Sequence, residues 1–318
     1  MVDTEFIERI DFYAGAFPAR YGEKLSSVMD VTLREGNNHS HHQQMDINMA
    51  GFGFTFEGPL SPKSSYLYSL KRSFLDFVIS STGMQAIPEY WSSQGKIAYH
   101  LSPTQKIYIN FIGGIDEINI EGEDNPQLRG AENVDYSSWQ TTLGVTYKNL
   151  FSKKGYFQSS FGKSLVALKA KVYELDQNLN RNYYFNRDDL EDDFSFRSEI
   201  VYKFSNYLDM SSGLTAKHMR LDFDNWYKNN PTYIYGYSLS ESEIPQLITK
   251  VKFDTTYFGK QYFYTIIDSV GTLDTLKTNA LLEYNKVGGF FHFNLNPLQR
   301  VEISIGGRFD YMTFTDES

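Results

Sequence analysis

The chain has 318 residues, a formal net charge of −9 and no cysteine, which argues against a nucleic-acid-binding surface and excludes disulfides and thiolate metal sites. Aromatic residues make up 16% of it although its mean hydropathy is −0.43, and no stretch reaches the roughly 18 apolar residues that a membrane-spanning helix needs. Such a composition is typical of a transmembrane β-barrel, in which lipid-facing apolar residues alternate with lumen-facing polar ones.

Residues 1–40 differ from the rest of the chain. Residues 6–15 and 26–36 have the character of strands, and the segment between them is a compact turn punctuated by glycine and proline. A polar linker follows at residues 37–42. The sequence therefore predicts a small globular unit ahead of a second domain over residues 41–318.

The second domain shows repeated period-two alternation. In residues 139–147, for example, Leu143 and Val145 alternate with Thr142 and Thr146. The pattern predicts an all-β fold, a partial antiparallel transmembrane β-barrel. About eleven strands are expected, at residues 43–50, 52–60, 65–77, 94–101, 105–115, 137–149, 155–171, 194–205, 207–221, 280–295 and 299–314.

Between residues 45 and 56 the apolar positions change parity, from Ile47 to Phe52 and Phe54. A single strand cannot change face without a bulge, whereas two strands joined by a tight turn can. We therefore predict a tight turn at residues 50–53, where two glycines supply backbone freedom.

The predicted strands are joined alternately by short and long connections. The short ones fall at residues 61–64, 102–105, 152–154, 205–207 and 296–299. The long ones fall at residues 80–93, 117–136, 172–193 and 222–277, and residues 250–267 have the pattern of a further hairpin. Short periplasmic turns and long extracellular loops are the asymmetry of outer-membrane barrels.

Strand parity also assigns the two faces of the sheet. The lipid-facing set is predicted to include Ile97, Tyr99, Ile107, Ile109, Phe111, Leu143, Val145, Phe196, Ile200, Tyr202, Met210, Leu214, Ile303 and Ile305. The charged strand residues predicted to face the lumen are Arg72, Lys96, Arg197, Glu199, Lys203, Lys217, Glu302, Arg308 and Asp310.

The N-terminal unit carries a resemblance to a known family. Its turn, GAFPARYG at residues 15–22, and the strand SSVMDVTLREG at residues 26–36 resemble the end of the plug domain in TonB-dependent outer-membrane receptors. Two shorter runs are also similar to that family: FEGPL at residues 56–60, and GGRFDY at residues 306–311.

The resemblance implies the C-terminal end of a plug followed by the first half of a barrel. Complete outer-membrane transporters have roughly 22 strands and a plugged lumen, so we expect an open half-barrel whose plug end lies on the concave side. Residues 1–30 contain no signal-peptide pattern. We therefore expect an incomplete chain that lacks the TonB-contacting segment, the start of the plug, the second barrel half and the final aromatic strand.

For function, the resemblance implies active import of a scarce nutrient across the outer membrane of a Gram-negative bacterium. The nutrient would belong to the siderophore, cobalamin, glycan or peptide class. The implied partners are outer-membrane lipid, the TonB complex acting through the missing segment, the nutrient at the extracellular face and, as a further candidate, a surface lipoprotein. No cofactor and no nucleic acid is implied.

The candidate ligand-contacting residues lie in the longest predicted loop. They are Trp226, Tyr227, Tyr233, Tyr235 and Tyr237. Aromatic rings at a loop tip can stack on a flat ligand or a sugar, but they can also order the loop or belong to the interfacial girdle.

Other polar clusters have simpler readings. His39, His41 and His42 fall in a polar linker, and the acidic runs at residues 121–124 and 188–193 lack the spacing of a calcium loop. We read them as solvated surface and assign no metal site. No motif positions a Ser/His/Asp set, so we predict that the protein is not an enzyme and has no catalytic residue.

Two rival functions share the strand pattern. A passive porin-like channel would need no plug, and the N-terminal unit argues against it. A soluble β-sandwich carbohydrate-binding module would bury one face of each strand, but it would not require short turns on a single rim.

Overall fold

A computed structural model describes the backbone of residues 2–15, 17–48, 51–73, 86–120, 133–175, 181–228, 233–237, 250–257, 260–266, 276–298 and 301–317. In the segments 233–237, 250–257 and 260–266 it describes no side chains. Within the described residues, no helix has both the length and the apolar character to cross a membrane.

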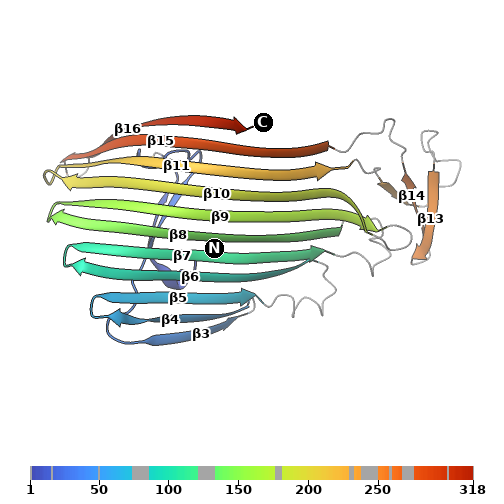
Figure 1. Cartoon of the computed structure of the whole chain (residues 1–318), viewed down its shortest axis with the longest axis horizontal. Helices are drawn as coiled ribbons and strands as arrows, with labels where there is room; N and C mark the ends of the chain where they lie inside the picture. Colours follow the sequence, from blue (N-terminus) through green and yellow to red (C-terminus); the bar gives the residue numbers. More distant parts are fainter. Residues whose placement is uncertain are drawn as a thin grey trace.

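Eleven antiparallel strands form one large sheet, which confirms the predicted number. Sheet neighbours follow chain order, except that β11 pairs with β15 (Figure 1). The strands are β3 (His42–Asn48), β4 (Gly51–Ser61), β5 (Ser64–Ser73), β6 (Ala86–Ser102), β7 (Gln105–Ile120), β8 (Asn133–Ser152), β9 (Gly155–Leu175), β10 (Arg181–Lys203), β11 (Leu208–Tyr227), β15 (Leu276–Leu298) and β16 (Val301–Glu317).

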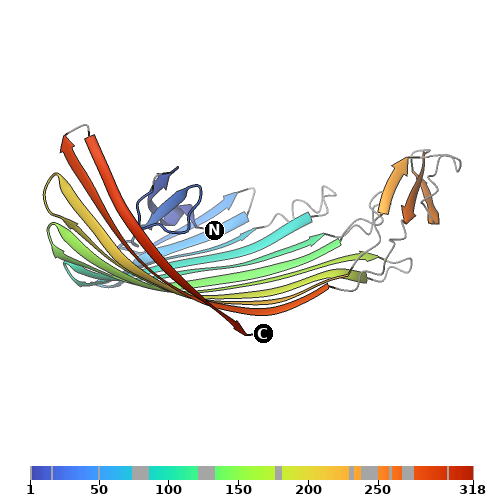
Figure 2. The same ribbon diagram turned by 90° about the horizontal axis from the view of Figure 1, so that it is seen from above.

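The large sheet is a single curved layer with the N-terminal residues on its concave side (Figure 2). These residues form a short 3-10 helix, η1 (Thr4–Phe6), and a two-stranded sheet of β1 (Ile7–Tyr13) and β2 (Val28–Leu33). Among the described residues, β3 and β16 each pair on one side only, so the large sheet is open. This confirms the predicted half-barrel, and a β-sandwich, which needs two packed layers, does not fit.

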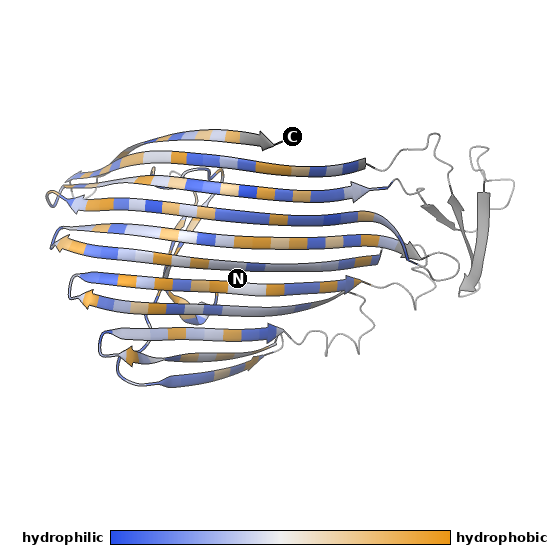
Figure 3. Cartoon of the chain, viewed as in Figure 1, coloured by the Kyte–Doolittle hydropathy of each residue, from blue (hydrophilic) through white to orange (hydrophobic). Residues whose placement is uncertain are grey.

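Polar and apolar residues alternate along the strands, which is visible as bands of colour (Figure 3). Because successive side chains of a strand point to opposite faces, this alternation sorts them onto the two faces of the sheet. Val145 lies opposite Ile109 and Phe161 on the convex face, and its side chain is 40% exposed. The register puts the whole predicted lipid-facing set on this face. Arg197 and Glu199 lie on the concave face, 2.7 Å apart and with Glu199 buried, as predicted.

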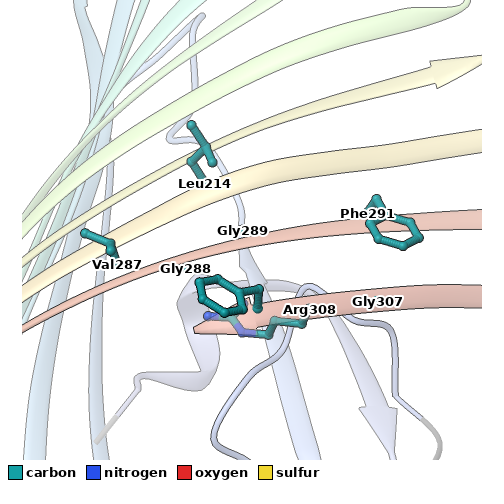
Figure 4. Close-up of a pocket in the computed structure, with 8 residues that line it drawn as sticks. Leu214, Val287, Gly288, Gly289, Phe291, Gly307 and Arg308 are labelled. Carbon is teal, nitrogen blue, oxygen red and sulfur yellow. The ribbon is translucent and has the colours of Figure 1, made fainter. Parts of the chain in front are cut away.

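A shallow hollow on the convex face lies where β11, β15 and β16 meet (Figure 4). Gly289 and Gly307 leave the space open between the apolar side chains of Leu214, Val287 and Phe291. The lining is apolar on this face, as expected for a surface in contact with lipid hydrocarbon.

Arg72 was predicted to face the lumen, but it lies on the convex face. It is paired with Phe52 on β4 and Trp91 on β6, and both neighbours belong to the convex face. Its guanidinium lies 5.5 Å from the centre of the Trp91 ring and 3.8 Å from Glu89. The residue lies at the end of β5, where an arginine and a tryptophan suit the membrane–water interface. For Glu302, the side chain lies outside the description.

The strands run further than predicted at the end that carries the long connections. The predicted loop at residues 172–193 is mostly strand, because β9 reaches Leu175 and β10 starts at Arg181. The acidic run 188–193 therefore lies in β10 and not in a loop. Beyond the apolar band both sheet faces meet water, so backbone pairing continues without the alternation that marks a strand in the sequence.

The predicted change from one strand to the next between residues 45 and 56 and the predicted hairpin are both present. Ile47 pairs with Phe52 and Asn48 with Gly51, so residues 51–53 belong to β4 and not to the predicted turn, and residues 49 and 50 lie outside the described residues. Between β11 and β15 a separate three-stranded sheet has the order β12-β14-β13. Its strands are β12 (Tyr233–Tyr237), β13 (Lys250–Tyr257) and β14 (Lys260–Ile266).

The strand ends show most of the predicted asymmetry. At one end of the large sheet, β4, β6, β8, β10 and β15 are each followed by the next strand within a few residues (Figure 1). At the other end, β5, β7 and β11 are followed by longer segments before the next strand of this sheet, whereas only residues 49–50 and 176–180 separate β3 from β4 and β9 from β10. On an outer-membrane barrel the first end would be periplasmic and the second extracellular.

Candidate functional site

The N-terminal unit, residues 2–40, is a hairpin folded around its own turn. Ile10 pairs with Val31 across β1 and β2. Below them, the Tyr21 hydroxyl donates a hydrogen bond to Asp30. Burial, together with this acidic partner, raises the pKa of Tyr21 above its ordinary range. The turn is therefore held by polar contacts within the unit, which leaves its outer surface for the large sheet.

Glu35, just after β2, is the centre of the first contact with the concave wall. Its carboxylate accepts hydrogen bonds from Lys106 Nζ at 2.8 Å and Tyr108 Oη at 3.0 Å, and His100 Nε2 lies 2.8 Å away. Burial alone would raise the pKa of Glu35, but the hydrogen bonds from Lys106 and His100 outweigh it and lower that pKa to about 2. The carboxylate is thus charged and fixed to β6 and β7.

Neighbouring residues extend this contact onto β4. Arg34 Nη1 lies 2.6 Å from a carboxylate oxygen of Glu57, and Arg34 Nε donates to the Glu5 carbonyl at 2.6 Å. The backbone N–H of Asn37 donates to the same Glu57 carboxylate at 2.9 Å. Lys96, buried on the concave face, donates to the Leu33 carbonyl. Partly buried charge-assisted hydrogen bonds of this kind are stronger than exposed ion pairs.

The start of the chain makes a third contact, on β5 and β6. Asp3 lies 3.0 Å from Lys71 Nζ, and the Asp3 backbone N–H donates to Gln94 Oε1 at 2.9 Å. Burial raises the pKa of Asp3, but hydrogen bonds from Ser69 and Lys71 produce a net decrease. The N-terminal unit is therefore bound to four consecutive strands, β4 to β7.

The opposite wall, β15 and β16, holds the turn of the unit. Glu23 lies 2.5 Å from Lys286 Nζ, and Arg308 Nη1 donates to the Arg20 carbonyl at 3.4 Å. Arg308 is itself fixed by Asp310, whose oxygens lie 2.7 Å from Nε and Nη2. The turn at residues 15–22 and the run at residues 306–311, which resemble the same family separately, thus meet in space.

Gly36 allows the close approach at the first wall, which gives a testable prediction. A Cβ at Gly36 would overlap the backbone carbonyl of Tyr66, which cannot move aside as a flexible side chain would. Gly36→Ala should therefore destabilise the protein by about 2 kcal/mol through overpacking, measured by chemical unfolding. Gly15→Ala is the matched control, because a Cβ at Gly15 meets nothing within 4 Å. Equal effects of both variants would show that the unit does not pack against β5.

The predicted ligand-contacting aromatics are only partly described. Trp226 and Tyr227 end β11 at consecutive positions, so their side chains point to opposite faces of the sheet. Tyr233, Tyr235 and Tyr237 lie in β12, where the side chains are outside the description. Their role in ligand contact therefore stays a prediction.

The histidines and acidic residues singled out by sequence have local partners. His42 Nε2 lies 2.8 Å from Ser40 Oγ, and the His41 ring lies 6.0 Å from the ring of Tyr66. Asp188 lies 2.9 Å from Lys169, and Asp193 lies 2.7 Å from Lys217. Among the described residues, no group of three or more His, Asp or Glu side chains is arranged to hold a metal. Residues 121–124 lie outside them.

Comparison with known proteins gives no match to a family model or to a curated protein. Solved structures do match. The structure of FpvAI with pyocin S2 has a TM-score of 0.67 at 9% identity, over 99% of this chain and 42% of that one. The ferripyoverdine receptor of the outer membrane of Pseudomonas aeruginosa has a TM-score of 0.65 at 8% identity, over 98% and 42%. The chain has the fold of a TonB-dependent outer-membrane receptor.

A third match, the ferric-catecholate import receptor Fiu from Escherichia coli K12, has a TM-score of 0.59 at 11% identity, over 98% of this chain and 46% of that one. The chain spans about half the length of the receptor structures it matches. The large sheet thus has the fold of part of a receptor barrel wall. That the N-terminal unit is the end of a plug stays a prediction from the resemblance. Following that prediction, the unit is called the plug end below, and its contacts with the sheet are called plug–wall contacts.

Proposed function

We propose that the protein is an outer-membrane receptor that imports a scarce nutrient with energy from TonB. The observation that supports the proposal is the N-terminal unit bound to both walls of the half-barrel, through Glu35 on β6 and β7 and through Glu23 on β15. A complete plug fixed in this way would close the lumen to passive diffusion, so passage would require a ligand and an energy input. The nutrient would be of the siderophore, cobalamin, glycan or peptide class.

The proposal also assigns the two parts of the chain and the surfaces that would meet TonB and the ligand. Residues 1–40 would be the end of the plug and residues 41–318 part of the barrel. TonB would engage a segment outside this chain, and the ligand would meet Trp226, Tyr227 and the β12 tyrosines at the extracellular face. Two of the matched structures hold a bound partner, pyocin S2 in one and ferripyoverdine in the other, which supports a role in ligand uptake.

Conductance separates the receptor from its rival, a passive porin-like channel. The full-length protein, reconstituted in planar bilayers, is expected to show little steady conductance because the plug closes the lumen. A large, constant conductance would favour the passive channel. Heat-modifiability on a gel should be measured on the same sample to establish that the barrel is folded.

The long connection between β11 and β15 provides a test of topology. We expect a protease added to intact cells that carry the full-length protein to cleave between residues 228 and 276, since only the extracellular rim of a barrel carries long excursions. The short β6–β7 turn at residues 103–104 is the internal control and should be protected. Cleavage at that turn with protection of the long connection would invert the assignment of the rims.

A further inference from the structure

A cavity of about 270 Å³ lies on the barrel wall, close to the end that carries the long connections. It is lined by Tyr90 of β6, Asp116 and Ile118 of β7, and Tyr136 of β8, with Glu89 at its edge. Tyr90 is directly opposite Asp116, and Ile118 is directly opposite Tyr136. Two tyrosines therefore flank one carboxylate across three adjacent strands.

Four of the five residues that line the cavity belong to the concave face, and the fifth, Glu89, pairs with Glu117 on the convex one. Tyr90 and Asp116 have the same strand parity as Gln94 and Tyr108, which contact the plug end. Tyr90 precedes Gln94 by four residues, so it lies nearer the end of β6 that follows a long connection. The cavity is thus on the lumen side, beyond the plug end, where an incoming ligand would pass.

The carboxylate of Asp116 has no compensating charge. Among the described residues it makes no hydrogen bond or ion pair, although it is half-buried. The other acid at the cavity, Glu89, is directed to Arg72 at 3.8 Å. A half-buried carboxylate without a partner is costly, and a ligand that supplies a positive charge removes that cost.

We infer that this cavity binds a cationic nitrogen group of the imported ligand, an ammonium or a guanidinium. Asp116 would accept charge-assisted hydrogen bonds from the nitrogen, and the faces of Tyr90 and Tyr136 would add cation–π attraction. The volume suits a head group and not a whole nutrient. The chain's net charge of −9 also disfavours a polyanionic ligand. The inference rests on the proposed transport function, and within it favours a basic peptide.

The test uses the full-length receptor in detergent and the probe peptide Gly-Arg-Gly, with the citrulline peptide as its neutral isostere. Saturation-transfer NMR measures the affinity of each. The arginine peptide should bind, and the citrulline peptide should bind about tenfold more weakly or worse, because charged hydrogen bonds contribute most of the affinity. Asp116→Asn should weaken the binding of the arginine peptide by a similar factor, and the variant should no longer prefer it to the citrulline peptide.

Three further variants, at two positions, serve as controls. Glu117→Gln makes the same charge change at the next residue, which lies on the convex face, and should leave binding unchanged. Tyr136→Phe keeps the ring and should retain most of the binding, whereas Tyr136→Leu should lose it. Equal binding of the arginine and citrulline peptides, or equal effects of the Asp116 and Glu117 variants, overturns the inference.

Failure here is distinguishable from failure of the transport proposal. A receptor that is closed in planar bilayers but does not bind the arginine peptide refutes the cationic subsite alone. A receptor with a large constant conductance refutes the proposed function, whatever the peptide does.

Discussion

Val145→Arg is expected to destabilise the full-length protein in a lipid bilayer by about 2–4 kcal/mol, because it puts a cation on the lipid-facing surface near the middle of the apolar band. Val145 lies between Ile109 and Phe161 on the convex face. No carboxylate lies among these direct strand neighbours to compensate the new charge. The free energy of unfolding should be measured by denaturant titration in vesicles.

Thr142→Arg is the matched control on the same strand. Thr142 lies on the concave face and is exposed, with its hydroxyl 2.8 Å from Ser164 Oγ. Arginine there meets the aqueous lumen, so the free energy of unfolding should fall by only about 1 kcal/mol, the contribution of one hydrogen bond. Equal losses at the two positions would mean that neither face of β8 contacts lipid.

Glu35→Gln is expected to weaken the attachment of the plug end by about 2–3 kcal/mol, since the neutral amide loses the charge-assisted hydrogen bonds from Lys106 and Tyr108. Amide hydrogen exchange in β2 (Val28–Leu33), which leads into Glu35, should then become about 30-fold faster or more. Glu8→Gln is the control: Glu8 is an exposed acid of the same unit. A similar acceleration in both variants would assign the effect to charge in general.

The same contact predicts a pH dependence. The folded pKa of Glu35, about 2, lies below its ordinary value of 4.5. A carboxyl with a lowered pKa stabilises the folded state fully above the ordinary value and progressively less as pH falls through the folded one. The protection of the β2 amides in the wild type, measured as the exchange rate relative to the intrinsic rate at each pH, should therefore fall between about pH 4.5 and 2. In Glu35→Gln this acid-dependent step should become smaller, and the part that remains is assigned to Asp3 and Glu57, whose pKa values are also lowered. A step of unchanged size would contradict the role of Glu35.

The sequence predicted the membrane-facing part of the sheet well because lipid imposes a strict pattern there. Leu143 and Val145 face hydrocarbon and Thr142 faces the lumen, so period two is visible without a structure. The same rule fails in the upper part of β10, where Asp188 and Asp193 are on opposite faces and both meet lysines. The prediction for Arg72 was wrong for a related reason, because a cation on the convex face is tolerated at the interfacial end of a strand.

The plug–wall contacts could not be predicted from the sequence. Glu35 and its partner Lys106 are separated by 71 positions, and Arg308 and the Arg20 carbonyl by 288. Nothing in the local pattern pairs such residues, because the curvature of the whole sheet brings them together. Trp226 and Tyr227 were selected as candidates because they are aromatic and adjacent in the sequence. They lie at consecutive positions of a strand, however, so their side chains cannot share one face of the sheet.

The most direct test of the central claim is a spin-label scan of β8 between residues 139 and 149 in the full-length protein in lipid bilayers. The chain contains no cysteine, so each single-cysteine variant carries one label. Accessibility to oxygen, which concentrates in hydrocarbon, should peak at odd positions such as Leu143 and Val145. Accessibility to a water-soluble relaxation agent should peak at even positions such as Thr142. A profile without period two, or one with the opposite parity, would contradict the assignment of this sheet as a lipid-embedded barrel wall around a plug.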